Sequence, residues 1–330
     1  MILRALFVLI LTAVYVFGET EENVNQQVDV GSGGNLVVDV SFGSVDIDAA
    51  GGDKVSIQAH REIDMRNEAS EKQFLDEAPI LISKDGNTVR LTARRKDNRG
   101  WSWHGHIEMD AKYTVHVPKN FNLDLRTGGG AISAADVTGT LKAATSGGKL
   151  KLTKLHGPID AKTSGGGIAI ADCEGALVVK TSGGGIHSTG GTGSLDARTS
   201  GGSIDVRDFK GDTLVRTSGG TLQIDNIGGK VSGETSGGSI TASLISPVPG
   251  DVDLSSSAGS IVLNVPTDAA INIDARASSG AVANGLSLNT SSNERDELRG
   301  TMNGGGKSVI LRANAGSVSL RPTPAKTAAR

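Results

Sequence analysis

The densest group of side chains that could bind a partner lies between residues 94 and 106. It contains Arg94, Arg95, Trp101, Trp103, His104 and His106, with further positive charge on Lys96 and Arg99. Histidines two residues apart can share a metal ion, but the sequence fixes no third ligand, so we predict neither a metal nor any other cofactor. Exposed tryptophan often anchors an interface. We therefore predict a contact surface here, with the alternative that the tryptophans pack as a cap on neighbouring strands.

Acidic residues show no pattern that indicates an enzyme. Glycoside hydrolysis needs two placed carboxylates, and sugar-cleaving clefts commonly contain aromatic platforms. From residue 127 onward the only aromatic residue is Phe209. We predict that the protein is not an enzyme, and we keep a carbohydrate-active β-helix enzyme, a lyase or a hydrolase, as the alternative.

Glycine pairs recur along the chain, as they do in calcium-binding β-rolls. Those repeats need an aspartate two residues beyond the last glycine, and no aspartate recurs there. Asp136, Asp172 and Asp208 do share one repeat position, but Lys154 and Gly190 interrupt the series. We interpret these aspartates as solvated turn residues rather than calcium ligands.

Two further ladders of like residues could bind something. Threonines recur along the chain in phase with residues that we expect to point inward. We therefore expect their hydroxyls to form hydrogen bonds at corners of the fold rather than an ice-binding surface. A basic row contains Lys162, Lys180, Arg198 and Arg216. We interpret this row as a solvated face partnered by nearby Asp160 and Asp196, and the alternative is a site for acidic polymers.

The element that must position all these residues is an 18-residue repeat. Thr-Ser-Gly-Gly or a close variant starts at seven evenly spaced residues: Thr127, Thr145, Thr163, Thr181, Thr199, Thr217 and Thr235. A fixed short period marks a solenoid of stacked coils. Counting from the threonine, position 6 is apolar and positions 8, 15 and 17 are mostly apolar, which is the alternation of strands with one buried face.

The repeat therefore predicts an all-β fold, a parallel β-solenoid (β-helix) with 18-residue coils and a small insertion near residues 61–110. Glycines at positions 3, 4 and 13 suit sharp corners between two or three strands per coil. Parallel crossovers are nearly always right-handed, so we expect that hand. Three hexapeptides per coil, the pattern of left-handed β-helices, is the alternative.

The first 18 residues have the features of a signal peptide. Arg4 precedes an apolar run of 13 residues, Ala5 to Phe17, which is shorter than the roughly 20 residues that span a bilayer. Val16 and Gly18 are small enough for signal peptidase. We predict export to the periplasm, the cell envelope or the exterior. An uncleaved anchor is the alternative and the one case in which we expect membrane association.

The remaining chain divides by how closely it keeps the period. Over residues 24–126 we expect degenerate coils with an inserted helix, hairpin and loop, and over residues 127–245 regular repeats. Over residues 246–320 we expect irregular coils with a polar projecting loop at 284–299, and over residues 321–330 a disordered tail. The single cysteine, Cys173, occupies an inward position. It can form no disulfide within the chain, and we interpret it as a small buried apolar residue.

Several segments resemble a known bacterial family, the "putative adhesins", a domain of unknown function built from Gly-rich β-solenoid coils. The similar segments are Val115-His-Val-Pro118, Leu125-Arg-Thr-Gly-Gly-Gly-Ala-Ile132, the serial Thr-Ser-Gly-Gly starts, Val262-Leu-Asn-Val-Pro266, Gly304-Gly-Gly-Lys-Ser-Val-Ile-Leu311 and Asn314-Ala-Gly-Ser-Val-Ser-Leu320. The resemblance as a whole covers roughly residues 25–320, and the run from Trp101 to His106 is not one of the similar segments. That family offers no catalytic residues to carry over.

The resemblance implies a non-enzymatic envelope or cell-surface module with an adhesin-like binding or structural role. Its partner would be an envelope or surface ligand, either a protein or a polysaccharide. The formal net charge of −3 gives no reason to expect nucleic acid as a partner.

Overall fold

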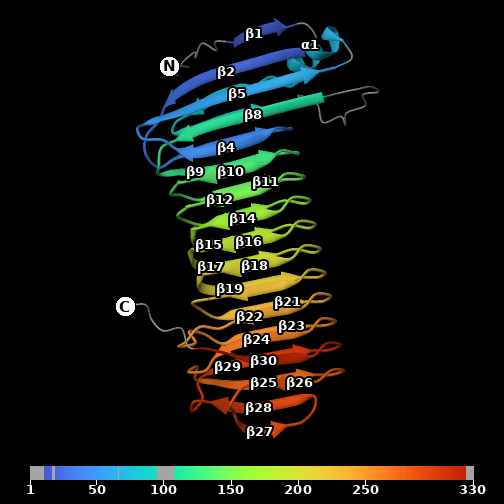
Figure 1. The fold of residues 1–330 in the computed structure, drawn as a ribbon. Coiled ribbons are helices and arrows are strands. Elements are labelled where there is room, and N and C mark those ends of the chain that lie inside the picture. Colours follow the sequence, from blue (N-terminus) through green and yellow to red (C-terminus); the bar gives the residue numbers. More distant parts are fainter. Residues whose placement is uncertain (1–10, 17–18, 66, 95–107, 325–330) are drawn as a thin grey trace. The chain divides into compact units, whose positions relative to one another are not determined.

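The fold is almost entirely β-sheet (Figure 1). A computed structural model describes residues 11–16, 19–65, 67–94 and 108–324. The chain divides into two compact units, Met1–Lys151 and Leu152–Arg330, and β12 (Leu150–Thr153) contains the boundary between them. Among the described residues, no helix is long and apolar enough to cross a membrane.

The N-terminal unit contains strands of two sheets. In one sheet the order is β1 (Leu11–Val16), β2 (Glu19–Asp29), β5 (Lys54–Asp64), β8 (Glu108–Val117), β4 (Ser44–Ala49) and β10 (Ile132–Ala135). In the other it is β11 (Leu141–Thr145), β9 (Phe121–Thr127), β3 (Gly34–Val40), β7 (Thr88–Ala93) and β6 (Leu81–Asp85). The predicted hairpin is formed by β6 and β7.

Strands of this unit pair in two ways, parallel and antiparallel. Strands β4 and β10 pair in parallel, as coils do, whereas β1, β2, β5 and β8 pair with one another antiparallel. Residues 24–60, expected as degenerate coils, thus include two long antiparallel strands. These strands are longer than the strands of the coils: β2 and β5 each have 11 residues, whereas many coil strands have four.

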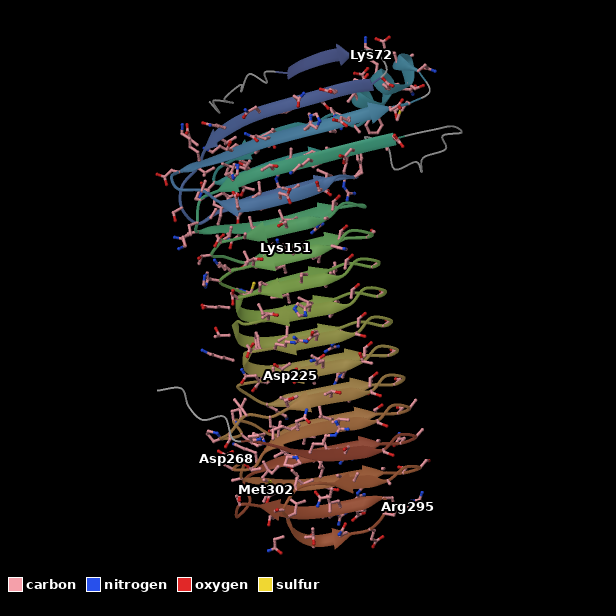
Figure 2. The ribbon with its side chains drawn as sticks, viewed as in Figure 1. Lys72, Lys151, Asp225, Asp268, Arg295 and Met302 are labelled. Atoms are coloured by element: carbon pink, nitrogen blue, oxygen red, sulfur yellow. The ribbon has the colours of Figure 1, made fainter. Side chains whose placement is uncertain are left out.

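One helix, α1 (Glu68–Glu77), lies where the sequence predicted a short helix. Asn67 caps its start, with the side-chain oxygen accepting a hydrogen bond of 2.9 Å from the backbone N–H of Ser70, which is a preferred N-cap arrangement. Phe74 is buried on its inner side in a cluster with Ile63. On the opposite side, Lys72 projects outward (Figure 2).

A buried ion pair holds this helix against the sheet. Arg61 is fully buried and donates through Nε and Nη2 to one carboxylate oxygen of Glu22, while its Nη1 donates to the carbonyl of Ala78 at 2.7 Å. Its guanidinium also lies 5.9 Å from the centre of the Phe74 ring. A buried charge is tolerated when it is paired and hydrogen-bonded in this way.

The C-terminal unit also contains strands of two sheets. One has the order β14 (Ile168–Ala171), β16 (Ile186–Thr189), β18 (Ile204–Arg207), β20 (Leu222–Asp225), β22 (Ile240–Ser243), β24 (Ile261–Pro266), β30 (Val318–Thr323), β26 (Val282–Asn284). The other has the order β27 (Asn289–Asn293), β28 (Glu297–Met302), β25 (Ile271–Ala277), β29 (Lys307–Ala313), β23 (Val252–Ser256), β21 (Val231–Thr235), β19 (Lys210–Thr217), β17 (Thr192–Arg198), β15 (Glu174–Lys180), β13 (Ile159–Lys162).

Equivalent positions of successive coils are paired in parallel, as the 18-residue period predicts. Ile168 lies opposite Ile186, which lies opposite Ile204, and each of these side chains is at most 1% exposed. Each regular coil in this unit contains two strands, not the three that a hexapeptide pattern would give. The parallel β-solenoid prediction is confirmed, and the hand of the coil stays a prediction.

The end of the chain departs from the expected order of coils. Strands β29 and β30 insert between pairs that precede them in sequence. The polar segment 284–299, predicted as a projecting loop, instead supplies β27 and the first part of β28, which pair antiparallel at the edge of a sheet. That prediction was wrong because β27 pairs antiparallel with β28, in which Leu298, Gly300 and Met302 alternate with polar residues and are buried.

The repeated threonine occupies the corner between coils. Thr199 is buried, and its hydroxyl donates to the carbonyl of Gly184 in the preceding coil at 2.8 Å while accepting from the N–H of Gly202 at 3.3 Å. The same pair of bonds recurs at Thr145, Thr181, Thr217 and Thr235. The prediction that these hydroxyls bond at corners is confirmed.

The second glycine of each Thr-Ser-Gly-Gly lies against the backbone of the coil before it. A β-carbon placed on Gly202 would lie 1.9 Å from the carbonyl oxygen of Gly184, whereas one on Gly201 would have its nearest neighbour, the carbonyl oxygen of Ser182, at 3.6 Å. Real β-carbons do not approach backbone oxygen as closely as the first distance. Glycine is therefore required at the second position and merely tolerated at the first.

Gly202→Ala should lower the stability by about 3 kcal/mol or more, because forcing an extra carbon into a filled space costs about 1–3 kcal/mol even where side chains can move. Gly201→Ala is the matched control, and we expect a change of less than about 1 kcal/mol. Urea denaturation followed by circular dichroism compares the two midpoints. Equal midpoints for the two variants would contradict the close approach.

Tyr113 gives the N-terminal unit a sensitivity to alkali. It is fully buried on β8, and burial raises the pKa of its phenol to about 12, although the neighbouring Arg61 charge acts in the opposite direction. The folded pKa exceeds the unfolded value of 10.0. The contribution to stability is therefore fully present below pH 10 and is lost as the pH rises toward 12.

We expect the wild-type chain to lose about 2 kcal/mol more than Tyr113→Phe between about pH 9 and pH 12, since one pKa unit corresponds to about 1.4 kcal/mol. The measurement is urea unfolding of both proteins at the two pH values. Chains starting at Glu19 suit it, because Tyr113 is then the only tyrosine. Parallel losses in both proteins would show that the phenol does not titrate on unfolding.

Candidate functional site

The contact surface predicted from sequence lies mostly outside the described residues. This applies to Arg95, Trp101, Trp103, His104 and His106. Arg94 is described: it follows β7, is exposed, and donates through Nε to Asp39 at 2.5 Å. The proposal of a tryptophan-anchored surface therefore stays a prediction.

The recurrent aspartates are turn residues. Asp136, Asp172 and Asp208 have φ values of 60°, 52° and 56°, in the left-handed region that Asp and Asn tolerate better than most residues. Lys154 and Gly190 occupy equivalent positions with φ of 50° and 69°. Within the described part of the chain, no group of three or more His, Cys, Asp or Glu side chains comes together to hold a metal ion.

The basic row of the C-terminal unit is partly neutralised. Arg198 donates through Nε and Nη2 to both carboxylate oxygens of Asp196, at 2.7 and 2.8 Å. Arg216 lies 3.2 Å from Glu234. Asp196 is one of the two partners expected from sequence, and this pairing favours a solvated, charge-balanced face over a site for acidic polymers.

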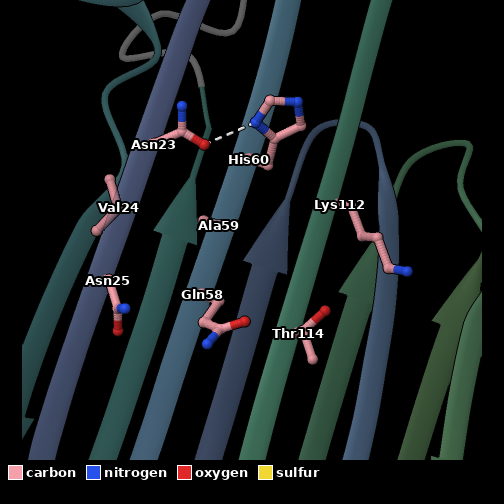
Figure 3. Close-up of a pocket in the computed structure, with 8 residues that line it drawn as sticks. All are labelled: Asn23, Val24, Asn25, Gln58, Ala59, His60, Lys112 and Thr114. Carbon is pink, nitrogen blue, oxygen red and sulfur yellow. Dashed lines mark hydrogen bonds between the residues drawn. The ribbon is translucent and has the colours of Figure 1, made fainter. Parts of the chain in front are cut away.

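A more extensive candidate site lies on the outward face of β2, β5 and β8. There a depression of about 700 Å³ is lined by side chains that are mainly polar, a volume within the usual range for ligand sites. Figure 3 shows its lining. We call it the polar groove and define it by Asn23, Asn25, Gln58, His60, Lys112 and Thr114, with Val24 and Ala59 beneath.

Strand register arranges the groove in two rows. Asn23 lies opposite His60, which lies opposite Lys112. The second row, two residues along each strand, consists of Asn25, Gln58 and Thr114. Because alternate residues of a strand point to the same face, both rows point outward, and Figure 3 shows the six side chains on one side of the three strands.

The first row is already engaged in contacts within the protein. The Nδ1 atom of His60 lies 2.7 Å from the side-chain oxygen of Asn23, and its Nε2 lies 2.9 Å from Glu62. The ammonium group of Lys112 lies 3.6 Å from Asp46. Both basic side chains of this row therefore already face a carboxylate.

The second row keeps its hydrogen-bonding capacity. The side chains of Asn25, Gln58 and Thr114 make no hydrogen bond within the described structure, although each offers both a donor and an acceptor. Sequence reasoning missed this row because it joins residues far apart in the chain. Only the antiparallel pairing of β2, β5 and β8 brings them together, and the 18-residue period does not predict that pairing.

The single cysteine, Cys173, lies in the other unit from the groove. Cys173 is fully buried in the C-terminal unit, and burial raises the pKa of its thiol. A raised pKa keeps a thiol protonated and unreactive at neutral pH. This agrees with the interpretation of Cys173 as a small apolar residue.

Comparison with known families assigns the chain. Residues 34–321 match the family model Toastrack DUF4097, and the chain belongs to this family. The groove residues Gln58, His60, Lys112 and Thr114 lie inside the match, and Asn23 and Asn25 precede it. No curated protein matches the sequence.

Several crystal structures are similar over nearly the whole chain. A "putative lipid binding protein" from Parabacteroides distasonis is 11% identical, with 90% of this chain and 96% of that chain covered and a TM-score of 0.40. A "putative adhesin" from Bacteroides fragilis is 11% identical, with 91% and 97% covered and a TM-score of 0.29. A "putative cell adhesion protein" from Clostridium sporogenes is 9% identical, with 91% and 100% covered and a TM-score of 0.21.

The Cys173 thiol should react with Ellman's reagent at least about 100-fold more slowly in the folded protein than in urea, because it is buried and protonated. The measurement follows absorbance on reagent addition with and without denaturant. The unfolded chain is the internal control, since it contains the same single thiol. Rapid native reaction would contradict the buried position.

Proposed function

We propose that the protein is a non-enzymatic, exported module of the cell envelope or surface that binds a ligand. The observation that carries this is the polar groove. Its row of Asn25, Gln58 and Thr114 offers donor and acceptor groups that make no hydrogen bond within the described structure. Its other row contains His60 and Lys112, which lie beside carboxylates and not beside a nucleophile. Such a surface suits recognition, which needs donors and acceptors, better than bond cleavage, which needs an activated group.

The proposed address follows from the first 18 residues. Their single arginine and apolar run suit export, and a mature chain starting near Glu19 would still contain the whole of β2 and both rows of the groove. The proposed partner is a surface protein or polysaccharide. Association with the membrane is proposed only for a chain that keeps its leader.

One observation favours a second candidate, a carbohydrate-active enzyme. In the row next to the groove, Glu62 lies opposite Glu21 on one side and Asp110 on the other. Residues directly opposite on neighbouring strands are about 5 Å apart, and the carboxyl groups of retaining glycosidases have a similar separation. Glu62, however, is exposed and engaged with His60.

A glycan array combined with an assay for new reducing ends separates the two candidates. We expect binding to envelope or surface material without release of reducing ends, by chains purified from the envelope fraction whose first residue is near Glu19. Turnover of any polysaccharide that Glu62→Gln abolishes would establish the enzyme instead. An intact Met1 product recovered from the cytosol would contradict the proposed address.

A further inference from the structure

We propose that the polar groove binds a neutral saccharide chain, with Asn25, Gln58 and Thr114 as its main contacts. The inference rests on the proposed binding function and names its ligand class. Three features of the groove lead to it: the kind of hydrogen-bonding groups, their regular spacing and the balance of charge around them.

The hydrogen-bonding groups of the second row match those of a sugar. A sugar hydroxyl both donates and accepts, so it is best satisfied by side chains that do the same. The amides of Asn25 and Gln58 each carry a carbonyl oxygen and an NH₂ group, and the Thr114 hydroxyl donates and accepts. Their exposure leaves them accessible, since Asn25 and Gln58 are exposed and Thr114 is partly so.

The spacing of the row suits a ligand with repeated hydroxyl groups. The three residues stand on three adjacent strands, and neighbouring strands are about 4.8 Å apart. An extended chain that crosses β2, β5 and β8 would therefore meet a polar side chain at each strand. A coil strand of four residues offers two outward side chains, whereas these three strands have 10 or 11 residues each and continue the same outward face beyond two rows.

The charge around the groove favours a neutral ligand. Its two basic side chains, His60 and Lys112, face Glu62 and Asp46. Beyond the first row, Glu21 and Asp110 flank Glu62, and like charges repel an anionic polymer. The contact row itself carries no charge. Binding should accordingly change little with salt, which screens charges but not neutral hydrogen bonds.

Among the described residues the lining contains no aromatic side chain, which predicts weak affinity at each site. Exposed hydrogen bonds are nearly balanced by those that water makes. We therefore expect a polysaccharide that presents many repeats to be retained far better than its monosaccharide, because multivalent presentation raises the apparent affinity.

The test uses the chain starting at Glu19 and immobilised dextran, mannan and β-glucan as neutral probes. The triple variant Asn25→Ala, Gln58→Ala, Thr114→Val removes the contact row. The matched control is Gln27→Ala with Ser56→Ala, because Gln27 and Ser56 are cross-strand partners two residues farther along β2 and β5 on the same face. Circular dichroism and thermal melting confirm that every variant is folded.

We expect at least one neutral probe to bind with little change between low and high salt. The triple variant should bind it at least about tenfold more weakly, a change of about 1.4 kcal/mol, and the control should stay within about twofold. The proposal is overturned if no neutral probe binds, if the triple variant binds as well as the control, or if retention occurs only on polygalacturonate or polylysine and disappears in salt. If the chain is retained on whole envelope material in any of those cases, the proposed binding function still holds and only the saccharide is rejected as its ligand.

Discussion

The threonine hydroxyl at each corner bonds two coils at once, and the regular part of the structure depends on this contact. It donates to a glycine carbonyl in the coil before and accepts an N–H three residues ahead. The contact works only if the second glycine, three residues after the threonine, lies against the preceding backbone without a β-carbon. Once the corner is fixed, period-2 alternation in the strands that leave it directs isoleucine, leucine and valine inward. Stability in such a stack is a sum over neighbouring coils.

The same constraint explains why the candidate site lies in the N-terminal unit. A coil strand of four residues offers only two outward side chains, and corners on either side limit its length. Strands β2, β5 and β8 are paired antiparallel and are not tied to the corner, so they extend to 10 or 11 residues and present successive polar rows. Their inner face bears the buried pair of Arg61 and Glu22, which holds α1. Long antiparallel strands thus provide both a covered core and an open, polar outer face.

Much of the solenoid could be predicted from the sequence, because each coil repeats the same pattern of threonine, glycine and apolar residues. The inward positions, the corner hydroxyls and the left-handed turn at Asp208 all follow from spacing. Even the irregular Gly191 has a reason: its φ is +96°, and a β-carbon there would lie 2.4 Å from the carbonyl oxygen of Cys173 in the preceding coil. Non-local pairings could not be predicted, because nothing in the spacing indicates that β2 pairs with β5 or that β29 inserts beside β23. The polar groove depends on such pairings, and a charged residue such as Arg61 gives no sign in the sequence that it is buried.

The central claim is that the corner contacts make the coils interchangeable units of 18 residues. The most direct measurement compares two internal deletions in the C-terminal unit by circular dichroism and thermal melting. Removing residues 217–234 joins Arg216 to Thr235 and preserves every corner, so this variant should keep the β-sheet spectrum and a cooperative transition. Removing residues 217–233 shifts all later strands by one residue and turns their apolar side chains outward, so it should fail to fold beyond the junction. Equal stability of the two deletions would contradict the account.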